Sequence, residues 1–301
     1  MPELPEVEHL RRTLEERLVG ATIVEVRCGR HNMLATTSLR SPRPVRLLNG
    51  ATVASLQRHG KQMAIVTVDG RVLVVHLGMS GRMTFESAPP TDADRHAHVA
   101  WLVQPKSPSK PKVPWGNTAH WLVFRDPRRF GELASLASPT ALERRWRALG
   151  PDAFLAPPDA LMAALRGLRR QAKAALLDQA VLAGVGNIYA DESLFRAGVH
   201  PTQSLDRLSE DRLVRLIAAI QVTLTAAVNS GGSTLRDYVD ANAQAGGYQS
   251  YHLIYGRAGE ACPTCGRPLE GLTAAGRTTV ACSTCQRLIH KRRGKVAGSS
   301  G

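Results

Sequence analysis

The chain has 301 residues, 43% of them hydrophobic and 21% charged, which is typical of a globular protein large enough for two or three domains. No apolar run approaches the roughly 18 to 20 residues that span a bilayer, and the N-terminus lacks the layout of a signal peptide, so the expected location is the bacterial cytoplasm. Lys and Arg outnumber Asp and Glu by 39 to 25, and this surplus of +14 favours a polyanionic partner, chiefly nucleic acid and next a membrane surface, over a basic surface that serves solubility alone.

The N-terminal stretch MPELPEVEHL begins a predicted helix that Gly20 ends. Its apolar residues recur at helical spacing, at Val7, Leu10, Leu14 and Leu18. Glu3, Glu6 and Glu8 suit the positive end of a helix dipole. The residues that mark a helix start do not explain why Pro2 and Glu3 stand at the extreme terminus, where chains usually fray. The stretch is therefore either an ordinary helix start or the position of a reactive group.

Residues 21 to about 135 are predicted to be mostly β-strands. The stretches ATIVEVR, ATVASLQ, MAIVTV, RVLVVHL and HWLVF are short and rich in β-branched residues, and turns such as Asp69-Gly70 separate them. This spacing is typical of an antiparallel sandwich or barrel. The Pro-, Lys- and Ser-rich stretch 104–118 interrupts it and is predicted to be a solvated loop.

From about residue 139 the pattern changes to helices. The stretches TALERRWRALG, PDALMAALRG, QAKAALLDQAVLAGVG, YADESLFRAG and SEDRLVRLIAAIQVTLTAAV show helical apolar spacing. Gly184 and Gly186 precede Asn187 and a predicted helix start, so the free amides there can bind an anion, with Asn187 as cap and phosphate donor. The alternative is a helix-turn-helix corner without a ligand.

The C-terminal part contains two CxxC pairs, Cys262 with Cys265 and Cys282 with Cys285, with sixteen residues between the pairs. This spacing predicts a four-thiolate zinc site on a hairpin, with a redox dithiol or disulfides as alternatives. Four thiolates leave no open coordination position, so one structural Zn²⁺ is expected. The arginines around the site predict a phosphate clamp. Cys28 stands alone and is expected to be a small buried apolar residue.

Taken together, ten stretches resemble the formamidopyrimidine-DNA glycosylase family, with its endonuclease VIII relatives close behind. In chain order they are PELPEVE (2–8), GK (60–61), HLGMSGRM (76–83), HAHV (96–99), DPRRFG (126–131), LLDQ (176–179), GVGNIYADESLFRAGVHP (184–201), GGSTLRDY (231–238), YGRAGEACPTCG (255–266) and GRTTVACSTCQ (276–286). The resemblance implies a multidomain α+β fold with an N-terminal antiparallel β-sandwich, a helix–two-turn–helix domain and a C-terminal four-cysteine zinc finger. We expect these domains at residues 1–135, 136–250 and 251–301, with DNA bound between them.

The resemblance also implies that the initiator methionine is removed, which makes Pro2 the N-terminus. A terminal proline is a secondary amine that can attack a sugar C1′ and form a cationic Schiff base, which a mid-chain proline cannot do. Glu3 is expected to shuttle protons and Lys61 to relay a proton in β-elimination, although a surface or phosphate-binding lysine is the alternative for Lys61. Arg277 is expected to hold phosphate and stabilise charge during δ-elimination. Glu6 resembles a family residue that assists the site, and helix-turn solvation is its alternative.

An enzyme that attacks C1′ beside a damaged base must rotate that nucleotide out of the duplex. Met79, Arg128 and Phe130 resemble the residues that the family inserts into the vacated space, and core packing is the alternative for Met79 and Phe130. The expected phosphate contacts are His96, Arg169, Lys173 and Asn187. Arg166 or Arg170 can take the role of Arg169.

The loop Ala241–Gly247 corresponds to the family segment that closes over a flipped purine, although the stretch AQAGGYQ (243–249) departs from the usual run. Together with the DPRRF arginine it favours oxidised purines such as 8-oxoguanine and formamidopyrimidines. We therefore predict a bifunctional DNA glycosylase and AP lyase that acts as a monomer on damaged duplex DNA of the nucleoid, in base-excision repair. The alternatives are an enzyme for oxidised pyrimidines and a non-catalytic zinc-containing protein that binds damaged DNA.

Overall fold

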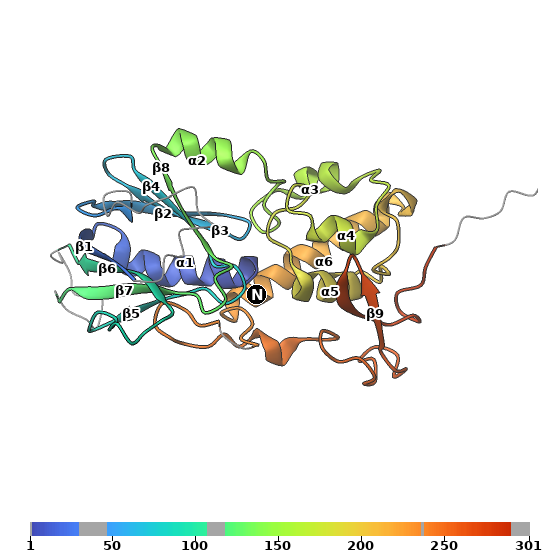
Figure 1. The fold of residues 1–301 in the computed structure, drawn as a ribbon. Helices are drawn as coiled ribbons and strands as arrows, with labels where there is room; N and C mark the ends of the chain where they lie inside the picture. Colours follow the sequence, from blue (N-terminus) through green and yellow to red (C-terminus); the bar gives the residue numbers. More distant parts are fainter. Residues whose placement is uncertain (1, 30–46, 107–117, 236–237, 290–301) are drawn as a thin grey trace, which may run out of the picture.

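The computed structural model describes residues 2–29, 47–106, 118–235 and 238–289. Within them, two β-sheets form the N-terminal half, and helices followed by a small hairpin form the rest (Figure 1). The predicted plan of an antiparallel sandwich, a helical part and a C-terminal four-cysteine module is confirmed. The initiator methionine, most of the predicted loop at 104–118 and the basic tail from residue 290 lie outside the described residues.

The sandwich consists of two four-stranded sheets with the orders β1-β6-β7-β5 and β2-β3-β4-β8. The strands are β1 (Thr22–Cys28), β2 (Val53–His59), β3 (Gln62–Thr67), β4 (Val72–His76), β5 (Arg82–Glu86), β6 (Ala97–Gln104), β7 (His120–Arg125) and β8 (Glu132–Leu136). Neighbouring strands are antiparallel, with Ile65 opposite Leu73 and Val75 opposite Leu133 in the second sheet. All the strands that the β-branched stretches predict occur, and β5, β6 and β8 complete the sheets.

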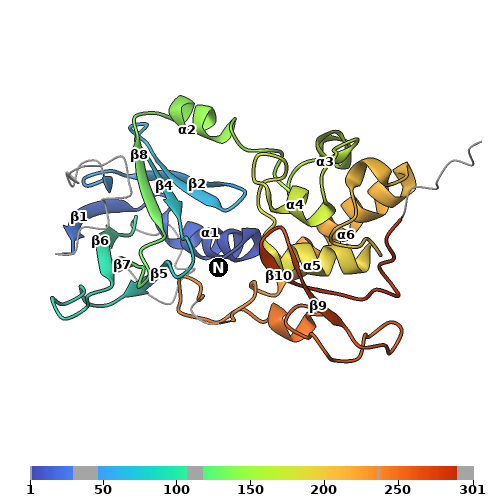
Figure 2. The same ribbon diagram turned by 45° about the vertical axis from the view of Figure 1, so that its right-hand side comes forward.

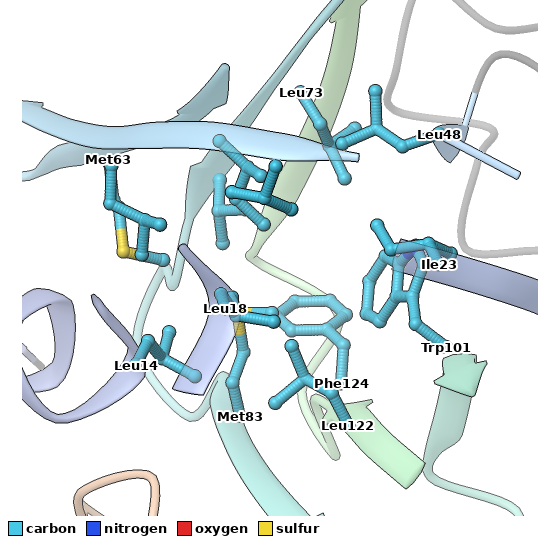
Figure 3. Packing of buried hydrophobic residues seen from close by; sticks show 14 of the residues in the cluster. Leu14, Leu18, Ile23, Leu48, Met63, Leu73, Met83, Trp101, Leu122 and Phe124 are labelled. Atoms are coloured by element: carbon cyan, nitrogen blue, oxygen red, sulfur yellow. The ribbon is translucent and has the colours of Figure 1, made fainter. Parts of the chain in front are cut away.

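The apolar faces of the two sheets enclose one core (Figure 3). Met63 and Leu73 enter it from the second sheet and Met83 and Phe124 from the first, all of them buried. Burying a side chain of this size contributes roughly 1.5–3 kcal/mol. The core therefore holds the two sheets together face to face.

Helix α1 (Leu4–Leu18) links the sandwich to the helical half. Glu3 is its N-cap and forms a capping box with Glu6, and Gly20, at φ +82°, turns the chain away after the end of the helix. Its Leu14 packs in the core of the sandwich, whereas Leu4 packs in the core of the helical half. The start of α1 thus lies where the two halves meet, as the position of the N-terminus in Figure 1 shows.

The remaining helices follow the sandwich in the chain. They are α2 (Pro139–Trp146), α3 (Pro158–Leu165), α4 (Ala172–Leu177), α5 (Asn187–Arg196) and α6 (Glu210–Asn229), with 3-10 turns at Leu205–Arg207 and Tyr248–Tyr251. Helix α2 packs through Leu142 on the outside of the second sheet, although chain order puts it after the predicted boundary at residue 135. Helix α4 is shorter than its predicted run to Gly186, because Asp178 leaves the helical conformation and accepts the Ala180 N–H at 2.9 Å.

The C-terminal module is a two-stranded hairpin, β9 (Glu270–Ala274) and β10 (Arg277–Ala281), that lies against α5 (Figure 2). Phe195 of α5 packs with Ile254, Leu269 and Val280 in a small apolar cluster that includes Cys262. The hairpin between the CxxC pairs was predicted and is confirmed. Among the described residues no helix is long and apolar enough to cross a membrane.

Candidate active site

The Glu3 carboxylate is buried between the starts of two helices. It caps α1, and it also accepts the Ile188 N–H at 3.0 Å and the Tyr189 N–H at 3.5 Å at the start of α5. A Cβ at Gly186 would lie 2.2 Å from the Glu3 carboxyl carbon, so this approach requires glycine. The anion that the GVGN stretch predicts is therefore the carboxylate of Glu3 itself. The N-cap of α5 is Gly186, so the prediction that Asn187 caps this helix is wrong.

Glu6 is buried beside Glu3, with 1% of its surface exposed, which rules out the prediction of solvation in an open helix turn. It accepts the Glu3 N–H at 2.7 Å, the Ser233 N–H at 2.7 Å and the Tyr189 hydroxyl. Burial and then the charge of Glu3 raise the pKa of Glu6 to about 7, and the hydrogen bonds from Tyr189 and Ser233 oppose this rise only in part. Glu6 can therefore exchange a proton near neutral pH.

Lys61 lies in the tight turn between β2 and β3 and is 8% exposed. Burial lowers the pKa of Lys61, the negative charges of Glu3 and Glu6 oppose this, and the positive charge of Arg277 adds to it. Lys61 therefore lies within electrostatic range of Glu3 and Glu6 at the start of α1 and of Arg277. The turn is held from the helical half, where Asp152 accepts the Gly60 N–H at 2.7 Å.

Arg277 is exposed and opens β10, next to the turn at Ala275 and Gly276, which have φ of +52° and +68°. Its charge acts on Lys61 from the C-terminal hairpin, more than 200 residues further along the chain. A guanidinium in this position can hold a phosphate, because it stays charged and offers several donors. The structure thus places Pro2, Glu3, Glu6, Lys61 and Arg277 in one region built from three parts of the chain.

Met79, Arg128 and Phe130 lie on two neighbouring loops of the sandwich and face solvent. Met79 and Phe130 are 38% and 55% exposed, so core packing is not their role. The Arg128 guanidinium lies 5.1 Å from the centre of the Phe130 ring. Large exposed apolar side chains beside an arginine suit insertion into a base stack. His96 is also exposed, and its carbonyl accepts the N–H of Asp126, two residues before Arg128.

Lys173 is not free to contact a phosphate, so the prediction that it is a phosphate contact is wrong. It is fully buried, and its Nζ donates to Asp191 at 2.6 Å, to the Thr279 hydroxyl at 2.6 Å and to the Thr278 carbonyl at 3.3 Å. An ammonium group has three donors, and all three are used. Lys173 therefore fastens β10 to the helical half.

The other expected phosphate contacts stay predictions. Asn187 is partly exposed, and one of its amide donors binds the Thr278 carbonyl at 3.0 Å. Arg169 is exposed and has no carboxylate within ion-pair distance among the residues that the structure describes, whereas Arg166 pairs with Glu210 and Arg170 with Asp178. This contrast favours Arg169 over its two neighbours as the arginine available to DNA.

The four C-terminal cysteines converge. Their sulfur atoms all lie within 4.8 Å of one another, with Cys265 and Cys282 3.5 Å apart and Cys262 and Cys285 3.9 Å apart. Tetrahedral zinc with bonds of about 2.3 Å places thiolates about 3.8 Å apart, so the set fits the ion. The chain makes the same turn at each CxxC pair. The Gly266 N–H donates to the Cys262 carbonyl, and the Gln286 N–H donates to the Cys282 carbonyl. Cys28 is exposed, so its predicted burial is wrong.

Two further residues of the site were not singled out from the sequence. His76 ends β4 close to Lys61, and burial first and then the charges of Lys61 and Arg145 lower its pKa, against the effect of Glu132. Tyr189 connects Glu6 to the hydroxyl of Ser233. Both lie in stretches that carry the family resemblance, HLGMSGRM and GVGNIYADE. Only this location in the sequence could have identified them as residues of the site.

Comparison with known proteins agrees with this arrangement. The family model described as Formamidopyrimidine-DNA glycosylase N-terminal domain matches residues 1–133, and the Formamidopyrimidine-DNA glycosylase H2TH domain matches residues 149–239. A Formamidopyrimidine-DNA glycosylase of Thermomicrobium roseum is 41% identical over 96% of this chain and 100% of its own, and one of Paraburkholderia phymatum is 39% identical over 95% and 100%.

Solved structures show the same likeness. The MutM (FPG) protein of Thermus thermophilus has a TM-score of 0.77 at 36% identity, covering 96% of this chain and 100% of its own. An FPG mutant of Lactococcus lactis bound to DNA containing Fapy-dG has a TM-score of 0.81 at 30% identity, covering 95% and 100%. Fold and site thus define a DNA glycosylase. The chain belongs to the formamidopyrimidine-DNA glycosylase family.

Proposed function

We propose that this protein excises oxidised purines from duplex DNA and then cleaves the strand at the resulting abasic site. The observation that carries the proposal is the clustering of Glu3, Glu6, Lys61 and Arg277 around the first residues of the chain. The site offers acids, a base and a phosphate-binding cation, and the secondary amine of Pro2 supplies the nucleophile once the initiator methionine is gone. Membership of a glycosylase family argues against a non-catalytic DNA-binding protein.

In the proposed reaction the Pro2 nitrogen attacks C1′ and the bond from C1′ to the base breaks, with the base leaving as a protonated group. Opening of the sugar ring at O4′ gives an iminium ion on Pro2, which draws electrons from the neighbouring carbons. Loss of a C2′ proton then expels the 3′ phosphate, and loss of a C4′ proton expels the 5′ phosphate. We assign the exchange of these protons to Glu3 and Lys61, and the binding of a leaving phosphate to Arg277.

We assign one structural Zn²⁺ to the four cysteines. We also propose that the protein is a monomer, that it acts in the bacterial cytoplasm and that its partner is damaged duplex DNA. Bound there, zinc would hold the hairpin that carries Arg277 and would take no part in the chemistry, because four thiolates would fill its coordination sphere. The domain limits 1–135, 136–250 and 251–301 remain our predictions.

The loop Ala241–Gly247 contacts the sandwich through its first residue, where the Phe85 N–H donates to the Ala241 carbonyl at 3.0 Å.

Borohydride trapping tests the proposal directly. Duplex DNA with 8-oxoguanine opposite cytosine should give a covalent adduct with protein whose mass shows Pro2 as the first residue. The matched control is the same protein with an uncleaved N-terminal extension, which should bind the duplex and give no adduct. No adduct from the processed protein would overturn the proposal.

A parallel reaction with thymine glycol measures the purine preference. One neighbour of this chain, the Fpg of Lactococcus lactis, has been solved with DNA containing an oxidised pyrimidine, at 29% identity and a TM-score of 0.80. We expect faster excision of 8-oxoguanine. Faster excision of thymine glycol would overturn the assignment to oxidised purines and leave the lyase chemistry intact.

A further inference from the structure

A buried polar contact joins the two loops that carry Met79, Arg128 and Phe130. Ser80 Oγ donates to Asp126 Oδ1 at 2.5 Å, and the two residues are 4% and 0% exposed. The same hydroxyl oxygen accepts the backbone N–H of Arg128 at 3.1 Å. Because Ser80 directly follows Met79, one hydroxyl group contacts both loops.

Asp126 extends this contact to the rest of the loop. Its Oδ2 accepts the Gly131 N–H at 2.6 Å, directly after Phe130. Its own N–H donates to the His96 carbonyl at 3.1 Å, and its carbonyl accepts His98 Nε2 at 3.0 Å. Buried donors and acceptors that lose their partners cost about 1–3 kcal/mol each. The positions of His96, Arg128 and Phe130 are therefore tied to one buried residue, Asp126, through its carboxylate and its backbone.

The backbones of the two loops are also in direct contact. Gly78 has a φ of +63°, and a Cβ there would lie 2.3 Å from the carbonyl carbon of Phe130. Arg129, between Arg128 and Phe130, has a φ of +57° and donates its N–H to the Asp126 carbonyl at 3.2 Å. The second loop is thus held in its own tight turn, and the first loop passes close to it at Gly78.

We propose that Ser80 and Asp126 are positioning residues, which hold Met79 and the Arg128–Phe130 pair at a fixed spacing so that they enter the DNA duplex as one unit. The inference rests on the proposed function, since it assumes that these side chains fill the space of a flipped nucleotide. Ordering two independent loops on DNA would cost conformational entropy at each binding event. A pair of loops already joined avoids that cost, because their spacing is set before DNA arrives.

The test compares two DNA substrates that differ in what must be inserted. A duplex with 8-oxoguanine opposite cytosine requires the vacated space to be filled, whereas a single-stranded oligonucleotide with an abasic site has no partner base and no stacked duplex. Ser80→Ala removes the shared hydroxyl, and Asp126→Asn replaces one acceptor oxygen by a donor. Thr67→Ala is the matched control, because Thr67 is 3% exposed and its hydroxyl donates to Asp69 at 2.5 Å in the far turn between β3 and β4.

Each single-turnover rate is divided by the fraction of protein molecules that borohydride can trap on DNA, because this fraction excludes unfolded protein. We expect Ser80→Ala and Asp126→Asn to lower the duplex rate about tenfold and to leave the single-strand rate within about twofold, with both rates unchanged in Thr67→Ala. Equal losses on the two substrates, or no loss on the duplex, would overturn this inference while the wild type stays active. A wild type that cleaves neither substrate would overturn the proposed function and this inference together.

Discussion

The Glu3 carboxylate lies at the N-terminus of α5, where the Ile188 N–H donates to it at 3.0 Å. The partial positive charge at a helix start stabilises a carboxylate by roughly 0.3–1 kcal/mol at exposed sites and more when partly buried. The start of the chain and the GVGN stretch, which are separated by about 180 residues, thus form one structural unit. The position of Glu3 beside Pro2 depends on a helix of the other half of the molecule.

Gly186→Ala should displace the Glu3 carboxylate, because the new Cβ would lie 2.2 Å from its carboxyl carbon. Gly186 has a φ of −126°, so alanine adds a collision and no backbone strain. We expect single-turnover base excision to fall about 100-fold, while duplex affinity changes much less. Gly271→Ala is the control, since its Cβ meets only the Ala258 methyl group, at 3.3 Å. A wild-type excision rate in Gly186→Ala would show that Glu3 need not occupy this position.

Lys173 and Arg169 should affect DNA binding differently. Each phosphate contact contributes about 0.9 to the slope of log affinity against log salt concentration. We expect Arg169→Ala to reduce that slope by about 0.9, because Arg169 is exposed, and Lys173→Met to leave it unchanged, because Lys173 is fully buried. Filter binding to a lesion duplex between low and moderate salt measures the slopes. A reduced slope in folded Lys173→Met would restore its predicted role as a phosphate contact.

The stability of the same variant reports the structural role of Lys173. Losing the ammonium leaves Asp191, which is 1% exposed, as an unpaired buried charge. Removing one partner of a buried ion pair typically costs about 3–5 kcal/mol. Chemical denaturation should therefore show a loss of this size in Lys173→Met and a smaller one in the double variant Lys173→Met/Asp191→Leu. Equal losses would mean that the ion pair is not the source of the effect.

Zinc content should depend on Cys265 and not on Cys28, although both side chains are exposed. We expect about one zinc per folded wild-type chain. Cys265→Ser should weaken zinc affinity and loosen the hairpin that carries Arg277, whereas Cys28→Ser should match the wild type. Metal analysis after dialysis against a chelator gives the stoichiometry, and duplex affinity gives the effect on DNA binding. Zinc that is absent from freshly folded wild type would contradict the assignment.

Local patterns predicted most of the elements, because each depends on residues close together in the chain. The strands follow from β-branched runs between turns, and α1, α5 and α6 from apolar residues at helical spacing. Helix α4 was predicted too long because LLDQAVLAGVG keeps helical spacing. The chain instead turns at Asp178 and brings Gly184 against Leu4, where a Cβ would lie 2.2 Å from Leu4 Cδ1.

The errors at the site come from partners that are distant in sequence. The sequence around Lys173 is that of any basic residue on a helix, and it does not reveal the contacts of Lys173 with Asp191 and Thr279. The sequence around Glu6 is that of a solvated helix start, and it does not reveal the hydrogen bond from the Ser233 N–H, 227 residues away. Composition and spacing do not determine such pairings. In each CxxC pair, by contrast, the two cysteines are close together in the sequence, and the four were predicted correctly as a cluster.

Glu6 should make stability depend on pH. Its pKa is about 7 in the folded protein and about 4.5 when exposed, so the folded state binds the proton more tightly than the unfolded chain. The contribution is therefore fully present below pH 4.5 and is lost as the pH rises to about 7, with a total of up to about 3 kcal/mol.

Glu6→Gln should remove this part of the pH dependence, because an amide does not titrate. Urea denaturation of both proteins from pH 4.5 to pH 8.5 gives the difference between their unfolding free energies, which should change by about 1.4 kcal/mol per pH unit at most between pH 4.5 and 7 and level off above pH 7. Glu16→Gln, on the exposed face of the same helix, should give a curve parallel to that of the wild type. A parallel curve for Glu6→Gln as well would mean that Glu6 stays ionised throughout, and that proton exchange at this site depends on Glu3 and Lys61 alone.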